Sequence, residues 1–163
     1  MAPVTYPAEF LGWSLDLDPH QSELTRQGWH CFTIRRKIGH GQAAFREARR
    51  RLLAWEMQRA VRLRPLIDGK IITLHLGCLR QRCWIIHTTQ SDTHACVAYG
   101  TLPGHLETGE ESFRVWLEDG TVWAECAAFS RPASWVTQLG GSLARLLQRL
   151  IARRYLAALV PAD

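Results

Sequence analysis

The chain has 163 residues, of which 47% are hydrophobic, with 20 Lys and Arg against 15 Asp and Glu and a formal net charge of +5. This composition predicts one globular domain, and folding at this length buries roughly 70% of the unfolded surface, which excludes disorder as a class. No apolar run approaches the ~20 residues of a membrane span, and the N-terminus lacks the basic and apolar regions of a secretory signal. We therefore expect a cytoplasmic protein with reduced cysteines.

Charge is segregated along the chain. Residues 26–82 carry fourteen basic and three acidic side chains, whereas residues 83–130 carry one basic and seven acidic side chains. Basic blocks of this kind are typical of solvated helix faces, which is the interpretation we favour. The alternative is an electropositive surface for nucleic acid or an anionic membrane, formed by Arg46, Arg49, Arg50, Arg145, Arg149 and Arg153.

The chain begins with an expected lead-in and a strand. Residues 1–28 predict an ordered lead-in, and residues 29–38 alternate between two faces with the period of two that is typical of a β-strand. We expect apolar anchors to hold the lead-in, namely Tyr6, Phe10, Leu11 and Trp13.

A helix is predicted over residues 42–59. Apolar residues recur there at spacings of three and four, which places them on one face of a helix. These residues are Phe45, Ala48, Leu52 and Trp55.

A run of strands follows this helix. Segments rich in β-branched and aromatic residues favour strands, and they are residues 70–77, 83–89 and 95–102. Asp119-Gly120 is typical of a two-residue hairpin turn, because both residue types tolerate a positive φ. We therefore expect a hairpin between strands at 113–117 and 122–129.

The last predicted element is a long amphipathic helix over residues 142–160. Its apolar face, which we expect to pack on the sheet, comprises Leu143, Leu146, Leu147 and Leu150. An amphipathic helix must bury its apolar face against another element. The element order therefore predicts an α+β fold in which a curved antiparallel β-sheet grips the C-terminal helix, with one helix after the first strand, in a single domain of residues 1–163.

Three sequence blocks resemble a known family. They are YGTLPGHLETGEE at residues 99–111, FSRPASW at 129–135 and LGGSLARLLQ at 139–148. They resemble the uncharacterised domain-of-unknown-function family numbered nineteen-ninety, from which the chain departs at Leu106, where that family commonly has proline. The resemblance implies a helix-grip, START-like fold and implies nearly nothing about activity.

The candidate site lies in residues 99–111, which we interpret as a glycine-rich loop, and at Ser130-Arg131. A histidine beside a carboxylate is the minimal general acid/base pair, so an enzyme would use His105 with Glu110 or Glu111. The alternative is a structural loop held closed by Arg131, paired with one of these two carboxylates. The candidate ligand-binding residues are Tyr99, Thr101, His105, Glu110, Glu111, Ser130 and Arg131.

Histidines and cysteines between residues 75 and 96 suggest a zinc site, but their spacing matches no zinc knuckle. These residues are His75, Cys78, Cys83, His87, His94 and Cys96. On a strand, His75 and Cys78 would point to opposite faces, so we expect buried cysteines and no metal. No phosphate-binding glycine motif is present, and we expect no cofactor.

Three functions are compatible with these patterns. We favour a small-molecule-binding domain that holds an apolar or amphipathic ligand between the sheet and the C-terminal helix. The alternatives are an enzyme that uses His105, and an adaptor whose basic surface binds nucleic acid or an anionic membrane.

Overall fold

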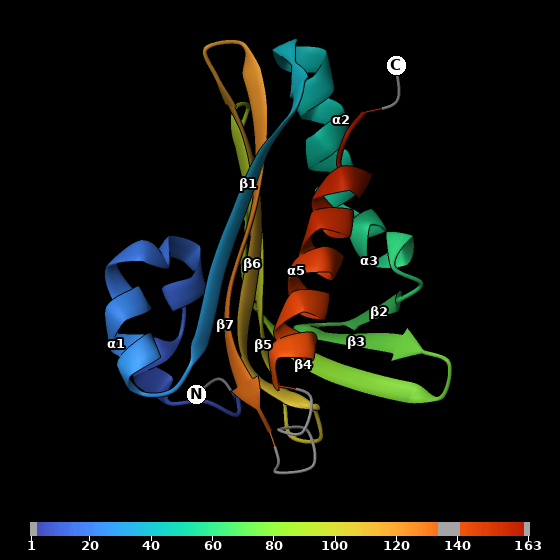
Figure 1. Ribbon diagram of the computed structural model, residues 1–163. Helices are drawn as coiled ribbons and strands as arrows, with labels where there is room; N and C mark the ends of the chain where they lie inside the picture. Colours follow the sequence, from blue (N-terminus) through green and yellow to red (C-terminus); the bar gives the residue numbers. More distant parts are fainter. Residues whose placement is uncertain (1–2, 134–140, 162–163) are drawn as a thin grey trace.

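A curved, seven-stranded antiparallel sheet forms the centre of the molecule (Figure 1). The structure is a computed structural model that describes residues 3–133 and 141–161, without the side chains of residues 141–145. The strand order is β1-β7-β6-β5-β4-β3-β2, so β2 to β7 form a meander and β1 pairs with β7. The strands are β1 (His30–His40), β2 (Arg64–Asp68), β3 (Ile71–Leu76), β4 (Leu79–Gln90), β5 (His94–Thr101), β6 (Glu107–Glu118) and β7 (Thr121–Pro132).

Three helices cover one side of the sheet, which we call the inner face (Figure 1). They are α2 (Gly41–Leu53), α3 (Glu56–Ala60) and α5 (Gly141–Ala158). The predicted apolar face of the first of these helices is confirmed, because Phe45, Ala48 and Leu52 are fully buried in the main core. The fold-class prediction is confirmed as well, since a long C-terminal helix packs against a curved antiparallel sheet.

The single helix predicted over residues 42–59 is interrupted at Trp55. This residue has a left-handed backbone conformation, with φ of 56°, between the end of α2 and the start of α3. Its ring is buried in the main core, 5.8 Å from the ring of Tyr99. The chain therefore bends where Trp55 enters the core, and helical spacing of apolar residues does not reveal such a bend.

The lead-in covers the opposite side of the sheet, the outer face (Figure 1). Its short helices are η1 (Ala8–Phe10), η2 (Trp13–Asp16), η3 (Asp18–His20) and α1 (Gln21–Arg26). Tyr6 and Phe10 are buried against Phe129 of β7, and the Tyr6 and Phe129 rings meet edge to face at 5.4 Å. Of the expected anchors, Leu11 is 40% exposed, so its predicted anchoring role is wrong.

The face by which α5 packs differs from the predicted one. Leu146, Leu147 and Leu150 are 56%, 55% and 45% exposed, and the side chain of Leu143 lies outside the described residues. The buried positions are Ala152, Tyr155 and Leu156 of α5, and Leu159, which directly follows the helix. The helix is thus anchored by its last two turns, whereas the three exposed leucines precede this buried segment.

Residues 99–111 are not the predicted glycine-rich loop. Strand β5 continues to Thr101 and β6 begins at Glu107, so only a short turn separates two paired strands. Gly109 lies inside β6. Only glycine fits at this position, because a Cβ would collide with the backbone carbonyl oxygen of Phe129. The glycine therefore allows a close approach between strands, which local sequence cannot distinguish from a loop signal.

The hairpin predicted at Asp119-Gly120 is confirmed. Both residues have positive φ, 48° and 72°, and Glu118 pairs with Thr121 across the turn. This turn fixes the register between β6 and β7, and so sets which side chains of the two strands share a face.

Candidate functional site

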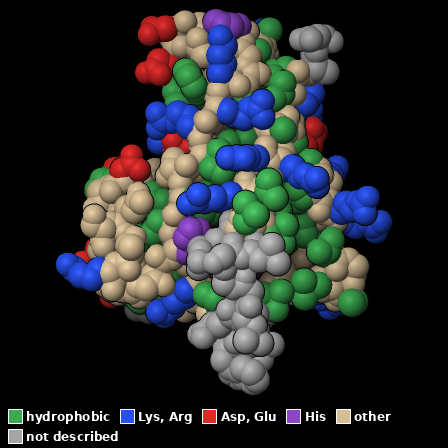
Figure 2. All heavy atoms as spheres, in the orientation of Figure 1, with side chains coloured by type: hydrophobic (Ala, Val, Ile, Leu, Met, Phe, Trp, Pro, Cys, Tyr) green, Lys and Arg blue, Asp and Glu red, His purple; other side chains and the backbone are tan. Residues whose placement is uncertain are grey.

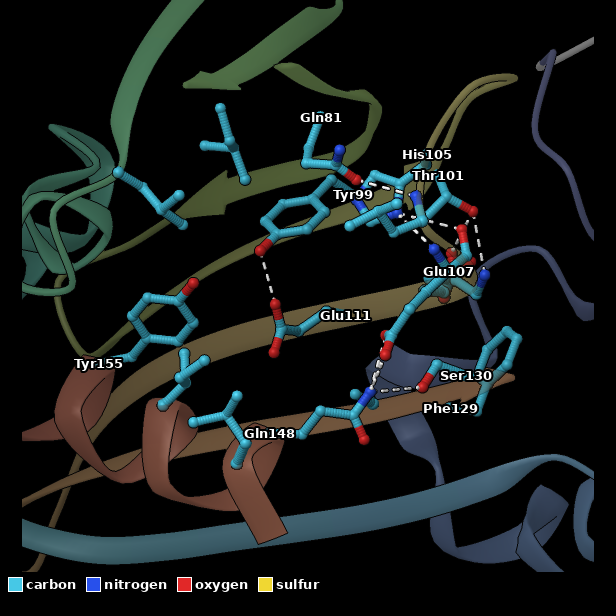
Figure 3. Close-up of a pocket in the computed structure, with 18 of the residues that line it drawn as sticks. Gln81, Tyr99, Thr101, His105, Glu107, Glu111, Phe129, Ser130, Gln148 and Tyr155 are labelled. Atoms are coloured by element: carbon cyan, nitrogen blue, oxygen red, sulfur yellow. Dashed lines mark hydrogen bonds between the residues drawn. The ribbon is translucent and has the colours of Figure 1, made fainter. Parts of the chain in front are cut away.

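A cavity of about 360 Å³ lies between the inner face of the sheet and α5 (Figure 3). Its lining is predominantly apolar, and polar side chains gather in two groups. Small-molecule sites in proteins have this character, since a few polar groups orient a ligand that apolar walls remove from water. We call the part of the cavity beside Tyr155 its inner end and the part beside His105 its outer end. Both ends lie on the inner face of the sheet.

The inner end holds the carboxyl group of Glu111, which β6 directs toward α5 (Figure 3). The Tyr99 hydroxyl donates a hydrogen bond of 2.5 Å to Glu111 Oε2, and the Cys126 thiol lies 3.4 Å from Oε1. Burial raises the pKa of Glu111 to about 7, although both hydrogen bonds act to lower it. Glu111 therefore changes charge near neutral pH.

Two phenols flank this carboxyl group. Tyr99 comes from β5 and Tyr155 from α5, and both rings border the cavity (Figure 3). Burial raises the pKa of each hydroxyl well above its usual range, and the nearby Glu111 raises it further. Both tyrosines thus remain neutral hydrogen-bond donors at any physiological pH.

A polar bridge closes the outer end between α5 and the sheet. The Gln148 side-chain amide donates to both carboxylate oxygens of Glu107, at 2.6 and 2.7 Å, and to Ser130 Oγ at 3.1 Å. Burial raises the pKa of Glu107, while the hydrogen bonds from Gln148 and Ser130 act to lower it. This bridge ties the N-terminal half of α5 to strands β6 and β7.

His105 lies in the turn beside this bridge. Its Nδ1 accepts a hydrogen bond of 3.0 Å from the backbone N–H of Glu107. Burial lowers the pKa of His105 to about 4. The imidazole is therefore neutral at physiological pH and adds no positive charge to the cavity.

Several exposed leucines surround the cavity. Leu76, Leu79, Leu106 and Leu147 line it and are also exposed to solvent, which makes the surroundings of the opening apolar. Figure 2 shows hydrophobic side chains gathered on this face of the molecule, with Lys and Arg side chains above them. Apolar patches of this kind are uncommon on a protein surface unless something binds there.

Six of the seven sequence-predicted site residues border the cavity, and Arg131 does not. Tyr99, Thr101, His105, Glu111 and Ser130 are brought together there (Figure 3). Whether they bind a ligand stays a prediction.

Glu110 has a different role from the predicted one. Its carboxylate accepts hydrogen bonds from the Tyr6 hydroxyl at 2.5 Å and the Gly12 N–H at 2.9 Å. It also accepts from the N–H and hydroxyl of Ser14, at 3.0 and 2.7 Å. Glu110 thus fastens the lead-in to the outer face of the sheet.

The predicted ion pair between Arg131 and Glu110 or Glu111 is wrong. Arg131 pairs with Thr108 across the strands and lies on the outer face, where its guanidinium carbon is 4.2 Å from the centre of the Trp29 ring. Glu111 lies on the other face, and Glu110 is occupied by the lead-in. Strand alternation therefore separates Arg131 from Glu111, whereas Glu110 shares the outer face with Arg131 but is bonded to the lead-in.

The predicted acid/base pairs are likewise not formed. The hydrogen bonds of the His105 ring go to the Glu107 backbone, and none joins it to the carboxylate of Glu110 or Glu111. The imidazole and the Glu111 carboxyl group share the cavity but lie in its separate polar groups (Figure 3).

Sequence reasoning missed four polar residues of the cavity: Gln81, Glu107, Gln148 and Tyr155. A signal for three of them exists. Glu107 and Glu111 are four residues apart on one strand and so share a face, whereas Gln148 and Tyr155 are seven apart on one helix and also share a face. Reading residues 107–111 as a strand would have revealed the first pair.

The histidines and cysteines considered for zinc are spread over the sheet. Cys78 is exposed in the turn between β3 and β4, whereas Cys83 and Cys96 are buried in separate strands. Among residues 3–133 and 141–161, no three His, Cys, Asp or Glu side chains form a group that would hold a metal. The expectation that the chain needs no metal stays a prediction.

Two of the candidate arginines on α2 have partners, whereas Arg46 is exposed. Arg50 pairs with Glu47 at 2.9 Å and with Glu56 at 2.6 Å, and Arg49 donates to the carbonyl of Ser91. The side chain of Arg145 lies outside the described residues. Within the part of the chain that the structure describes, no helix has the length and apolar character to cross a membrane.

Comparison with known proteins adds a family and a fold. A family model described as a domain of unknown function, DUF1990, matches residues 18–158. A UPF0548 protein of Deinococcus radiodurans is 29% identical over 172 aligned positions, which cover 93% of this chain and 84% of that protein.

Solved structures share the architecture at low sequence identity. A hypothetical protein from Helicobacter pylori superposes with a TM-score of 0.60 and 11% identity, covering 98% of this chain and 95% of the other. Norcoclaurine synthase from Thalictrum flavum superposes with a TM-score of 0.53 and 9% identity, covering 83% and 95%. The fold is therefore a helix-grip, START-like one, as the sequence predicts.

Proposed function

The chain belongs to the DUF1990 family, a domain of unknown function, and we propose that it is a small-molecule-binding protein. Its ligand is one apolar or amphipathic molecule, held in the cavity between the sheet and α5. The observation that carries this proposal is the cavity of about 360 Å³ with apolar walls and two polar groups. The fold that the chain shares with norcoclaurine synthase is consistent with this proposal, but a fold alone does not determine a function.

The exposed leucines around the cavity support an apolar ligand. Leu106 and Leu147 come from the turn before β6 and from α5, on two sides of the cavity. An apolar molecule that enters the cavity would contact these leucine side chains as it leaves water. Burial of such surface contributes roughly 25 cal/mol per Å², which favours this class of ligand over a fully polar one.

The alternatives have less support. An acid/base enzyme with His105 and Glu110 would need a carboxylate that the lead-in already occupies, and a His105–Glu111 pair lacks a hydrogen bond. Of the arginines that an adaptor for nucleic acid or an anionic membrane would use, Arg50 is already paired with two glutamates, whereas Arg46, Arg149 and Arg153 are exposed. We therefore keep ligand binding as the proposed function.

The test uses Nile red, an uncharged apolar dye whose fluorescence rises when it leaves water. We expect the parent protein to bind it saturably and Ala128→Leu to lose that binding, because Ala128 lines the cavity and a larger side chain fills it. Ala43→Leu is the matched control, since Ala43 is exposed on α2. Thermal melts establish that both variants fold.

Two outcomes would overturn the proposed function. One is the absence of saturable dye binding by the folded parent protein. The other is equal binding by the parent and a folded Ala128→Leu variant, because the dye would then occupy some other surface.

A further inference from the structure

The titratable side chains around the cavity are acidic or neutral. Glu107 and Glu111 face it, the two tyrosines hold their protons, and His105 is neutral. No Lys or Arg occurs among the described residues that line it, although the chain has 20 basic residues. Within the described part of the chain, the cavity therefore offers a ligand negative charge and no positive charge.

The carboxyl groups of Glu107 and Glu111 differ in how many hydrogen bonds they can still accept. Both oxygens of Glu107 accept hydrogen bonds from Gln148. Glu111 accepts one bond from a phenol and one weak bond from a thiol, whereas a carboxylate has about four acceptor positions. Glu111 is also partly accessible to the cavity. Glu111 is therefore the carboxyl group with more unused acceptor capacity.

Comparison with another buried glutamate shows what Glu111 lacks. Glu125 of β7 lies on the outer face with 5% of its side chain exposed, between Arg35 at 2.8 Å and Arg114 at 2.6 Å. Glu111 has no ion-pair partner among the described residues, and burial, together with the nearby Glu107, disfavours its charged form. A buried carboxylate without a cation is stabilised when a ligand brings one.

We propose that the ligand carries a basic nitrogen and that its ammonium group pairs with Glu111 while its apolar body fills the cavity. This inference rests on the proposed function, which it narrows to apolar amines. Tyr99, on β5, donates a hydrogen bond to the Glu111 carboxylate. The remaining acceptor positions of this carboxylate face the cavity (Figure 3). A carboxylate ligand is rejected by repulsion from Glu107 and Glu111, and an alcohol of the same shape lacks the ion pair.

The pairing makes affinity depend on pH. No positively charged group surrounds Glu111 among the residues whose side chains the structure describes. The titratable groups that face it are Tyr99 from β5, Cys83 from β4, Cys126 from β7, Tyr155 from α5 and Glu107 on its own strand. The ammonium ligand needs the ionised form of Glu111. With a pKa of about 7, affinity falls about tenfold between about pH 8 and about pH 6.

The experiment compares three ligands with one phenylbutyl body: phenylbutylamine, phenylbutanol and phenylbutyrate. Calorimetric titration of the parent protein at about pH 8 is expected to give an affinity for the amine at least about tenfold higher than for the alcohol, with the carboxylate weakest. Glu111→Gln removes this preference. Glu118→Gln, at the exposed hairpin between β6 and β7, retains it.

A further measurement keeps the inference testable if Glu111→Gln fails to fold. The parent protein alone is expected to bind the amine about tenfold more weakly at about pH 6 than at about pH 8, with no such change for the alcohol.

Failure of this inference and failure of the proposed function give different results. If the amine binds no better than the alcohol, or if only Nile red binds, the amine class is wrong and the cavity still binds small molecules. If Nile red and all three ligands fail to bind, the proposed function is wrong together with this inference.

Discussion

Glu110 and Glu111 are adjacent in the chain, yet their carboxyl groups lie on opposite faces of the sheet. Glu110 points outward and accepts four hydrogen bonds from the lead-in. Glu111 points inward and accepts the Tyr99 hydroxyl in the cavity. Strand β6 therefore carries a structural carboxylate and a candidate ligand-binding one side by side, and each can be altered without replacing the other.

Glu110→Ala is expected to destabilise the protein by about 3 kcal/mol, measured by urea unfolding. The substitution leaves the Tyr6 hydroxyl and the donors of Gly12 and Ser14 without their acceptor, and an unsatisfied buried donor costs about 1–3 kcal/mol. Glu118→Ala is the control, with an expected change below about 0.5 kcal/mol because Glu118 is exposed. Equal stability of the two variants would contradict the role assigned to Glu110.

Two leucines of α5 are expected to behave oppositely. Leu156 is fully buried, so Leu156→Ala should lower the free energy of unfolding by about 2–5 kcal/mol. Leu147 is 55% exposed, and Leu147→Ala should lower it by less than about 1 kcal/mol. Urea titration of both variants checks this, and the reverse ranking would restore the helix face expected from the leucine spacing.

Glu111 is expected to make stability depend on pH. In the folded protein its pKa is about 7, whereas in the unfolded chain it is about 4.3. Between these values the unfolded state binds fewer protons, so the free energy of unfolding falls as pH rises. This contribution is absent below about pH 4 and reaches up to about 4 kcal/mol of lost stability above about pH 7.

Comparison of the parent protein with Glu111→Gln isolates this contribution. His105 acts in the opposite direction, because its lowered folded-state pKa of about 4 makes stability rise with pH up to about 6.5. That contribution is common to both proteins and cancels in their difference. In urea unfolding from about pH 4 to about pH 8, the free energy of unfolding of the glutamine variant should rise relative to that of the parent as pH rises. A difference that does not change with pH would show that Glu111 titrates normally.

Arg131→Ala should change stability by less than about 1 kcal/mol. Arg131 is exposed and lies over the Trp29 ring, and an exposed cation–π contact contributes about 0.5–1 kcal/mol. Urea unfolding measures the change. A loss of about 3–5 kcal/mol would instead indicate that the guanidinium is one partner of a buried ion pair.

Much of the fold could be predicted from the sequence where local signals suffice. The hairpin at Asp119-Gly120 depends on two residues that tolerate positive φ, and the buried face of α2 on the spacing of Phe45, Ala48 and Leu52. The break at Trp55 and the strand that begins at Glu107 depend on contacts with distant segments. Local sequence patterns do not predict contacts with distant segments.

Prediction of the site had the same limit. The sequence located Tyr99, His105 and Glu111, but its patterns placed Glu110 and Arg131 in one cluster with them. A loop has no alternating faces, whereas a strand separates its neighbours onto two. Interpreting residues 107–111 as a loop therefore hid which carboxyl group faces the cavity.

The two halves of α5 are attached to the sheet in different ways. Tyr155 and Leu156 anchor the helix in the core, whereas Gln148, in its N-terminal half, joins it to the sheet through hydrogen bonds to Glu107 and Ser130. Substitutions at the anchor are expected to lower the melting temperature. For a ligand bound in the proposed way, substitutions at Gln148 are expected to change its residence time with little effect on the melting temperature, so the two properties could evolve separately.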